Sequence, residues 1–554
     1  MRRLRVSLLL AGVVLVVSVS SSHSQHFPRH RWSHRAGDTG TDAANGVAVD
    51  IRGHTVVAGS FEGTIDLGNG PLVSAGGTDV FVVLYDDDGA PVWSRRFGGP
   101  GNDAAYGVVT GATYLGSYNW LWEYTVTGAF EDTVSFGGDD LASAGGTDGF
   151  VARFDGNGAH VWSTRFGDEG DDVGRGISNL GSHEVSITGA VGDTQLGTSD
   201  ALIARYDTAG TQLWSHSYGG PLDDVGMSIA GTTITGEFRD QASFGGAPLV
   251  SAGGSDIFVA AYDGAGTHLW SQRFGGTQDD TGRSASPPYY TGSFRGTVDF
   301  GGGNVISAGG EDIFLLKLAN GVFQFVRRYG GPGNDAGNAV ATSSSNGDIE
   351  LSGRFQGTVN FGLNKLTSAG GSDGFLSLFT DTGTNVRNVR LGGIGDDTVN
   401  GLSDFHYLYI PEAPGYNVAI AGAFTNTMDL GGGPLVSAGG DDAFVVVYDE
   451  TWLTPVGPGL PASALSITNY PNPFNPATTV RYVVPADGPV TVAIYGVNGE
   501  RVATLVNHRH HVAGPHEVQW HGLSDSGERV ASGVYFAQVE HAGVKQTARL
   551  VMLK

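Results

Sequence analysis

The sequence predicts an all-β protein assembled from a structural repeat. A W-S-x-R-F-G-G motif, or a looser copy of it, recurs at intervals of 52 to 69 residues, and Asp follows each leader residue by ten positions. Glycine makes up 90 of the 554 residues, more than twice its average share of about 7%. Glycine combined with aromatic and β-branched residues indicates short strands joined by tight turns. The leader positions are Trp32, Trp93, Trp162, Trp214, Trp270, Phe325 and Arg387.

Each repeat contains four strand-forming runs. In the first copy, residues 46–61 (GVAVDIRGHTVVAGSF) and 79–97 (DVFVVLYDDDGAPVWSRRF) each place two such runs around a turn. Runs such as VFVVLY are apolar on both faces, as expected for a sheet covered by other sheets on either side. Seven repeats of four strands predict a seven-bladed β-propeller over residues 25–451. An open solenoid of the same repeats is the alternative.

The phase of the repeat favours a closed ring. The chain enters with a fourth-strand sequence, RHRWSHR at 29–35, and leaves with a third-strand sequence, DAFVVVYD at 442–449. We expect the first to pair with the second and so remove an open sheet edge.

The N-terminus is typical of an exported protein. Arg2, Arg3 and Arg5 precede an apolar run that ends in small residues, which predicts a signal peptide over residues 1–24. A membrane anchor is the alternative, although the run is short for a bilayer span. Loss of three arginines would change the formal charge from −25 to −25 − 3 = −28. Such an acidic chain disfavours nucleic acid as a partner, and we expect no integral membrane span in the mature chain.

The repeats resemble the seven-bladed β-propeller repeat family of exported bacterial proteins. The resemblance rests on the W-x-x-x-F-G-G…D, G-S-F and S-A-G-G-x-D-x-F motifs over roughly residues 30 to 450. Repeat three departs from it, with QLGTSD at 195–200 in place of SAGG, so a trimmed loop is expected there. The resemblance implies a fold and export but no defined activity.

The end of the chain follows a different pattern. A Pro/Gly-rich linker over 452–466 precedes a predicted β-sandwich at 467–554, in which Asn498-Gly499 predicts a type I′ hairpin turn. YPNPFNP (470–476), IYGVNGERV, WHGLSDSG (520–527), SGVYFAQV (532–539) and Lys554 resemble the C-terminal sorting domains of type IX secretion and the related Ig-like domain of flagellar hook-capping proteins. The resemblance implies secretion, attachment to the outer surface of a Gram-negative-type bacterium, and the secretion and attachment machinery as partners.

Catalytic motifs are absent from the sequence. It contains no G-x-S-x-G, no H-E-x-x-H, no phosphate-binding G-x-x-x-x-G-K-[ST] and no Cys. We therefore expect a surface-displayed binding or adhesion protein and no enzyme. An exported hydrolase or lyase that acts on polysaccharide is the alternative, with Glu123, Asp404 and Glu412 as its candidate carboxylates.

Two hairpins are longer than their counterparts in the other repeats. They span 111–125 and 403–417, are rich in Tyr and Trp, and belong to the repeats on either side of repeat one. Exposed aromatic residues suit stacking on sugars or contact with a partner protein. Packing of the two hairpins on each other is the alternative. The candidate ligand-binding residues are Tyr118, Trp120, Trp122, Tyr124, Phe405, Tyr407 and Tyr409.

The stretch GGPGND at 98–103 matches a calcium-binding nonapeptide pattern. Such sites need the motif in tandem, whereas here it occurs once per repeat, which favours a structural turn. A second Asp recurs in each repeat, from Asp79 to Asp442, and an Arg follows six of the seven leaders; Ser217 replaces it in repeat four. We expect backbone amides and the Arg to bind these carboxylates, with no metal or cofactor; a calcium role stays open as the alternative.

Overall fold

The computed structural model describes residues 29–116, 119–181, 183–192, 197–343, 347–406, 416–449, 465–470, 472, 474–484, 487–511 and 514–553. These residues form β-strands and no helix, which confirms the all-β class. Consequently, none of them forms a helix that could cross a membrane. The chain divides into two compact units, Met1–Thr454 and Pro455–Lys554, each of which we describe by itself.

The described part of the first unit contains seven four-stranded antiparallel sheets, which we number in chain order. Sheet 1 consists of β2 (Ala43–Val49), β3 (Thr55–Phe61), β6 (Asp79–Tyr85) and β7 (Pro91–Phe97). Sheet 2 consists of β8 (Ala104–Gly116), β9 (Asn119–Val134), β10 (Leu141–Asp155) and β11 (His160–Phe166). Sheet 3 consists of β12 (Val173–Leu180), β13 (Glu184–Val191), β14 (Asp200–Tyr206) and β15 (Gln212–Tyr218).

The remaining sheets repeat this order. Sheet 4 consists of β16 (Val225–Ala230), β17 (Thr233–Phe238), β20 (Asp256–Tyr262) and β21 (His268–Phe274). Sheet 5 consists of β22 (Thr281–Ser286), β23 (Tyr289–Phe294), β26 (Asp312–Ala319) and β27 (Val322–Tyr329). Sheet 6 consists of β28 (Ala336–Thr342), β29 (Ile349–Asn360), β30 (Lys365–Phe379) and β31 (Asn385–Leu391). Sheet 7 consists of β32 (Asp397–His406), β33 (Tyr416–Phe424), β36 (Asp442–Asp449) and β1 (Arg29–Ala36).

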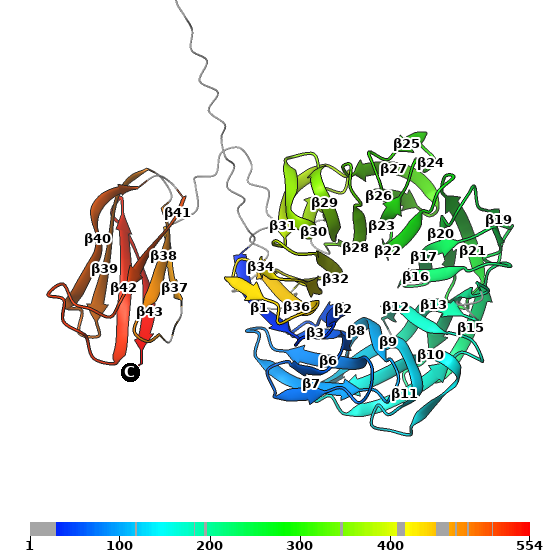
Figure 1. The fold of residues 1–554 in the computed structure, drawn as a ribbon, viewed down its shortest axis with the longest axis horizontal. Helices are drawn as coiled ribbons and strands as arrows, with labels where there is room; N and C mark the ends of the chain where they lie inside the picture. Colours follow the sequence, from blue (N-terminus) through cyan, green and yellow to red (C-terminus); the bar gives the residue numbers. More distant parts are fainter. Residues whose placement is uncertain are drawn as a thin grey trace, which may run out of the picture. The chain divides into compact units, whose positions relative to one another are not determined.

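The sheets neighbour one another in chain order. The first strand of each sheet contacts the first strand of the next, and β32 of the last sheet contacts β2 of the first. Figure 1 shows these strands innermost, around a common centre. The expected pairing of the chain's first and last repeat strands is also present, because β1 runs antiparallel to β36 as the outer strand of sheet 7.

A hydrophobic core lies between each pair of adjacent sheets. The third strands supply both sides: in β6, Phe81 and Val83 pack toward sheet 7, whereas Val82 and Leu84 pack toward sheet 2. All seven residues of β6 are buried. Runs that are apolar on both faces therefore lie between two cores, as their sequence indicates.

The second-to-third strand connections contain extra structure that the repeat pattern does not predict. Four of them fold into short two-stranded hairpins, and in sheets 2 and 6 the long strands β9–β10 and β29–β30 themselves extend into this region. Ile65 of the first short hairpin shows what holds these strands in place. Its side chain is fully buried in the core between sheets 7 and 1. The short hairpins are β4 (Thr64–Asp66) with β5 (Pro71–Val73), β18 (Gln241–Ala242) with β19 (Leu249–Val250), β24 (Thr297–Asp299) with β25 (Asn304–Ile306), and β34 (Thr427–Asp429) with β35 (Pro434–Val436).

The repeated Trp connects one sheet to the next. Trp93 of sheet 1 donates from Nε1 to the carbonyl oxygen of Gly156 in sheet 2, at 3.1 Å. Its ring covers Gly158, where φ is +74° and a Cβ would lie 2.7 Å from the indole. Glycine is therefore required in the D-x-x-G turn both for its conformation and for this close approach.

The second unit contains two antiparallel sheets that share one core. One consists of β37 (Ser466–Tyr470), β38 (Thr478–Val484) and β41 (Gly514–Trp520), and the other of β40 (Arg501–His511), β39 (Gly488–Gly496), β42 (Gly533–His541) and β43 (Val544–Met552). Trp520 and Phe474 are buried between them. This arrangement fits the expected Ig-like sandwich.

The predicted type I′ turn at Asn498-Gly499 is wrong. Gly499 has a φ of +83°, but Asn498 is not in the left-handed region that type I′ also requires. The N–H of Gly499 instead donates to the carbonyl oxygen of Gly496 at 3.0 Å. The hairpin therefore has a longer loop that ends in a left-handed glycine.

Candidate functional site

The hairpin of β8 and β9 is the longest first hairpin among the described sheets. Its strands contain 13 and 16 residues, compared with 7 and 7 for β2 and β3 of sheet 1. Trp120 and Leu121, near its tip, are each 40% exposed. The rings of Trp120 and Trp122 stack with centroids 5.8 Å apart and planes at 25°. The hairpin thus presents an apolar, aromatic surface to solvent.

Arg52, in the turn between β2 and β3, supports the base of this aromatic pair. Its guanidinium carbon lies 4.0 Å from the centroid of the Trp122 ring, in a cation–π contact. The same guanidinium donates to the hydroxyl of Tyr124 at 2.7 Å and to the carboxylate of Asp50 at 2.6 Å. Sheet 1 therefore fixes one face of Trp122 and leaves Trp120 as the outer member of the stack.

Tyr124 lies in the core, so its ring is not part of the exposed hairpin surface. Its side chain is fully buried, and its hydroxyl donates to Asp50 at 3.1 Å. Burial and the charge of Asp50 raise the pKa of Tyr124 above its usual range. Trp120, Trp122 and Tyr124 lie on the same face of β9, because side chains two positions apart in a strand point the same way. Tyr124 is buried because it lies four positions from Trp120, where the hairpin has rejoined the sheet.

The other candidate residues are less fully described. Sheets 2 and 7 both flank sheet 1, as expected, because β8 and β32 each contact β2. Phe405 belongs to β32, and its side chain lies outside the described residues together with Tyr118, Tyr407 and Tyr409. Their role in ligand binding stays a prediction.

Glu123, one of the carboxylates considered for catalysis, has internal partners. Its Oε2 lies 3.7 Å from Nη1 of Arg153 and 3.4 Å from Nδ1 of His183. Arg153 is buried, which places this ion pair inside the protein. The side chain of Asp404 and all of Glu412 lie outside the described residues. The catalytic alternative that rests on these carboxylates therefore stays a prediction.

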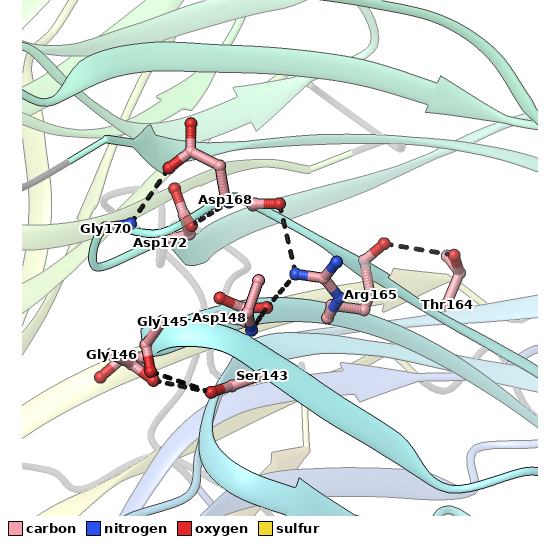
Figure 2. Close-up of polar contacts among 12 residues, drawn as sticks. Ser143, Gly145, Gly146, Asp148, Thr164, Arg165, Asp168, Gly170 and Asp172 are labelled. Carbon is pink, nitrogen blue, oxygen red and sulfur yellow. Dashed lines mark hydrogen bonds and ion pairs between the residues drawn. The ribbon is translucent and has the colours of Figure 1, made fainter.

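A cluster of two carboxylates and one arginine recurs where one sheet meets the next; we call it the carboxylate junction. Between sheets 2 and 3 it consists of Asp148, Arg165 and Asp172 (Figure 2). Arg165 donates from Nη1 to Oδ2 of Asp148, and the amide of Ala144, in the SAGG loop, donates to the same oxygen at 2.9 Å. The carboxylate of Asp148 is thus neutralised within its own sheet.

Asp172 belongs to the next sheet and accepts main-chain hydrogen bonds. The amide of Asp168 donates to its Oδ2 at 2.8 Å, and the amide of Gly192 donates to its Oδ1 at 2.8 Å (Figure 2 shows the first of these bonds). Its carboxylate therefore fixes the loop between the two sheets by accepting hydrogen bonds from main-chain amides, as the Asp side chain of an Asx turn does.

The expectation that amides and arginines bind the repeated carboxylates is confirmed for six junctions. In each, the Arg of the fourth strand contacts the repeated Asp of the third strand, and an Ala amide donates to that Asp. Asp200 lacks both partners in the sequence pattern, because Ser217 replaces the Arg and QLGTSD replaces the SAGG loop. The six ion pairs are Arg35–Asp442, Arg96–Asp79, Arg165–Asp148, Arg273–Asp256, Arg328–Asp312 and Arg390–Asp373.

The repeated Asp at the start of each first strand has a raised pKa. Burial is the largest cause of the rise. The negative charge of a neighbouring Asp, such as Asp148 beside Asp172, raises the pKa further, whereas the main-chain hydrogen bonds lower it. The pKa is raised to about 6 for Asp172, Asp280 and Asp335, and to about 7 for Asp42, Asp103, Asp224 and Asp397.

The glycines of GGPGND are explained by close approach. A Cβ on Gly98 would lie 2.6 Å from Cγ of Asp79 and 2.7 Å from Oδ2 of Asp103, and a Cβ on Gly99 would lie 2.2 Å from the carbonyl oxygen of Thr133. The motif thus threads the chain between two carboxylates and the neighbouring hairpin. Within the described residues, no group of three or more His, Asp or Glu side chains is placed to bind a metal ion.

One set of residues was not predicted from the sequence. It occupies the position three residues after each repeated Asp, from Asn45 to Asn400, at a β-bulge in every first strand. The sequence does contain a signal, because this position varies between repeats while its neighbours are small. Because the residue type at this position differs between repeats, a comparison of the repeats for shared residues does not identify it.

The second unit matches a known domain family. The model of the FlgD Ig-like domain matches residues 476–543, which confirms the Ig-like part of the resemblance. The chain is also 26% identical over 281 residues to the regulatory protein FlaEY of Caulobacter vibrioides, a match that covers 45% of this chain. The chain spans only 28% of the length of that relative.

Three solved structures are similar at low TM-scores. PorZ of Porphyromonas gingivalis, a bacterial surface component of the type-IX secretion system, is 13% identical with a TM-score of 0.31, over 94% of this chain and 75% of PorZ. Sqt1 of Chaetomium thermophilum is 12% identical with a TM-score of 0.36, over 76% of this chain and 98% of Sqt1. Dimeric latent PorU of Porphyromonas gingivalis is 10% identical with a TM-score of 0.17, over 95% of this chain and 34% of PorU. Scores this low establish neither the fold nor the function of this chain.

Proposed function

We propose that this protein is an exported binding or adhesion protein that uses a seven-bladed β-propeller as its scaffold. The order of the seven sheets, the contact of β32 with β2 and the pairing of β1 with β36 support the propeller. In this proposal the signal peptide is 1–24, the propeller 25–451, the linker 452–466 and the Ig-like domain 467–554.

The exposed aromatic stack on the β8–β9 hairpin carries the binding part of the proposal. The sheets otherwise repeat one frame, whereas this hairpin is extended and presents Trp120 and Leu121 to solvent. Trp122 is fixed from below by Arg52, so the stack is ordered before any ligand arrives. A preordered aromatic platform suits the apolar face of a sugar ring or a partner protein.

Export is the second part. The predicted signal peptide and the Ig-like domain match at the end of the sequence support it. We propose that residues 467–554 are recognised by secretion and surface-attachment machinery, which would place the propeller on the outer surface of the cell.

A glycan array tests the binding part. We expect the mature chain to bind a subset of glycans, and Trp120→Ala to remove that binding with little change in melting temperature. Leu269→Ala, which changes a 60% exposed residue in sheet 4, is the matched control and should bind normally. Unchanged binding by Trp120→Ala, or a large fall in its melting temperature, would contradict the proposal.

Deletion of residues 467–554 tests the export part. The truncated chain should fold and accumulate in the periplasm, as judged by fractionation and surface proteolysis of intact cells. Normal surface display of the truncated chain would show that residues 467–554 do not act as the secretion signal.

A further inference from the structure

Every first strand carries a β-bulge at the same position. In sheet 1 the pairing of β2 with β3 shifts between Ala44 and Gly46, which leaves Asn45 without a cross-strand partner, and the same shift occurs in the other six first strands. A bulge redirects the side chain of the extra residue. The first strands are innermost around the common centre (Figure 1), and the residues at the seven bulges all line one cavity.

These side chains line one cavity, which we call the axial cavity. It has a volume of about 320 Å³ and takes lining residues from all seven sheets. A volume near 300 Å³ is at the lower end of the range for small-molecule sites. Tyr106 of β8 lines the cavity, but Trp120, Leu121 and Trp122 near the hairpin tip do not, so a ligand in the cavity would be independent of the function proposed for that tip.

The lining of the axial cavity is chemically mixed. Three amides (Asn45, Asn338 and Asn400), two arginines (Arg175 and Arg283), Tyr106 and Met227 occupy the seven equivalent bulges. If these positions served only the frame, the same residue type would suit all seven, as it does at the repeated Asp and Gly positions. The packing that fixes the repeated Asp and Gly therefore does not fix these seven side chains, which are free to differ in chemistry around the cavity.

Positive charge converges on this cavity in a chain whose formal charge is −25. Arg354 joins Arg175 and Arg283 in the lining. Two acidic groups, Glu311 and Glu237, act on Arg283. Glu311 is shared, because its carboxylate also contacts Arg295 at 3.1 Å and Arg354 at 3.9 Å. Three guanidinium groups around one cavity form an anion site unless carboxylates match them.

Arg283 has unused hydrogen-bonding capacity. Its Nε is buried and has no hydrogen-bond partner among the described residues, a costly arrangement for a guanidinium N–H. Burial lowers the pKa of Arg283, and the charge of Arg354 lowers it further, whereas the charges of Glu311 and Glu237 raise it. An anion in the cavity beside the Arg283 guanidinium would relieve the repulsion between Arg283 and Arg354.

The amides and the tyrosine indicate what surrounds the anionic group. The Nδ2 groups of Asn45 and Asn338 donate to main-chain oxygens of the next sheet, at 3.0 and 2.8 Å, which fixes both amide planes. The Oδ1 of Asn45 also accepts a long hydrogen bond from Nδ2 of Asn400, at 3.5 Å. Amide oxygens suit hydroxyl donors, and a carboxamide oxygen can accept a second hydrogen bond. The Tyr106 ring, with the Arg175 guanidinium 4.9 Å from its centroid, offers a flat surface beside a positive charge.

We propose that the axial cavity binds a sugar-sized carboxylic acid of the uronic acid class, with its carboxylate between the arginines and its hydroxyls on the asparagine amides. The guanidinium fork matches a carboxylate in a bidentate geometry that the point charge of Lys cannot reproduce. A neutral sugar would leave the arginines unpaired and a bare inorganic anion would leave the amides unused.

Titration calorimetry of the mature chain with galacturonate, glucose and sulfate tests this. We expect galacturonate to bind at least about ten-fold more tightly than either of the others. Arg283→Gln should weaken galacturonate binding by about ten-fold to a hundred-fold, since the lost hydrogen bonds are charge-assisted. Arg175→Gln is a second variant that should weaken galacturonate binding. It changes an exposed side chain of the cavity, so it should leave the stability of the fold unchanged.

Arg239→Gln, at an exposed position of sheet 4 outside the cavity, is the matched control and should bind as the wild type does. The proposal is overturned if galacturonate does not bind, if glucose or sulfate binds equally well, or if both cavity variants retain full affinity.

Discussion

Nε of Arg35 lies 2.5 Å from Oδ2 of Asp442, a residue 407 positions further along the chain. The two side chains join β1 to β36 within sheet 7, so the beginning of the repeat region completes its end. Asp442 is fully buried, whereas Arg35 keeps 26% of its side chain exposed. The same pair occurs at five further junctions, but only here does it connect the two ends of the repeat region.

Arg35→Gln should therefore reduce the free energy of unfolding by about 1–3 kcal/mol, because it leaves a buried carboxylate without its cation. Chemical denaturation of the mature chain measures this. Arg31→Gln is the control: Arg31 lies 3.8 Å from Asp87, whose side chain is 50% exposed, and its loss should cost less than about 0.5 kcal/mol. Equal effects of the two changes would show that the buried pair does not stabilise the closure.

The junction between sheets 3 and 4 offers the reverse experiment. Ser217 pairs with Leu202 in the register that Arg96 has with Phe81 in sheet 1, so Ser217→Arg should bring a guanidinium to Asp200. Burial raises the pKa of Asp200, and the new cation should favour its ionised form. We expect the melting temperature to rise by an amount equivalent to about 0.5–1 kcal/mol.

Ser215→Arg is the matched control for that change. Ser215 pairs with Ala204, further along the same strands and away from Asp200, so an Arg there should leave the melting temperature unchanged. A similar rise in both variants would attribute the effect to net charge alone.

Much of the frame could be predicted because it repeats. The spacing of the Trp leaders and the apolar runs predicts four strands per repeat, and the shared occurrence of Asp and Arg predicts the ion pairs that the junctions contain. Repetition is informative since a side chain that packs between sheets must meet the same neighbours each time. The phase of the repeat likewise predicts the pairing of β1 with β36.

The candidate sites could be predicted less well, for two physical reasons. Tyr124 is as aromatic as Trp120, but which of them faces solvent depends on where the hairpin leaves the sheet, and local composition does not encode that. The axial side chains are directed by a bulge, which appears in the sequence only as a variable residue between small ones. Both features are set by tertiary structure.

Calcium should have little effect on stability. At six junctions the carboxylates are bound by arginines and backbone amides, so an ion would have to displace existing partners. We expect the melting temperatures in millimolar calcium and in chelator to agree closely for the wild-type chain. A rise of many degrees with calcium would instead assign an ion-binding role to the GGPGND turns.

The seven raised pKa values predict that stability falls as the pH rises. Asp103 illustrates the sign: its pKa is about 7 in the folded chain, against an ordinary value of 3.8, so the folded state retains a proton that the unfolded chain releases. Between these two values the folded state binds more protons, and its free energy of unfolding decreases with each rise in pH. The loss should be complete once the pH exceeds about 7, when the folded carboxyls have also ionised.

Asp103→Asn isolates this effect, because self-repulsion of an acidic chain also grows with pH. The amide resembles the protonated carboxyl and cannot ionise, so the difference in melting temperature between about pH 5 and about pH 8 should be smaller in the variant than in the wild type. Asp139→Asn, at an exposed position, is the control and should leave that difference unchanged. If the wild-type melting temperature rises over this interval, or if both variants respond alike, the junction carboxyls are ionised throughout and their raised pKa values are wrong.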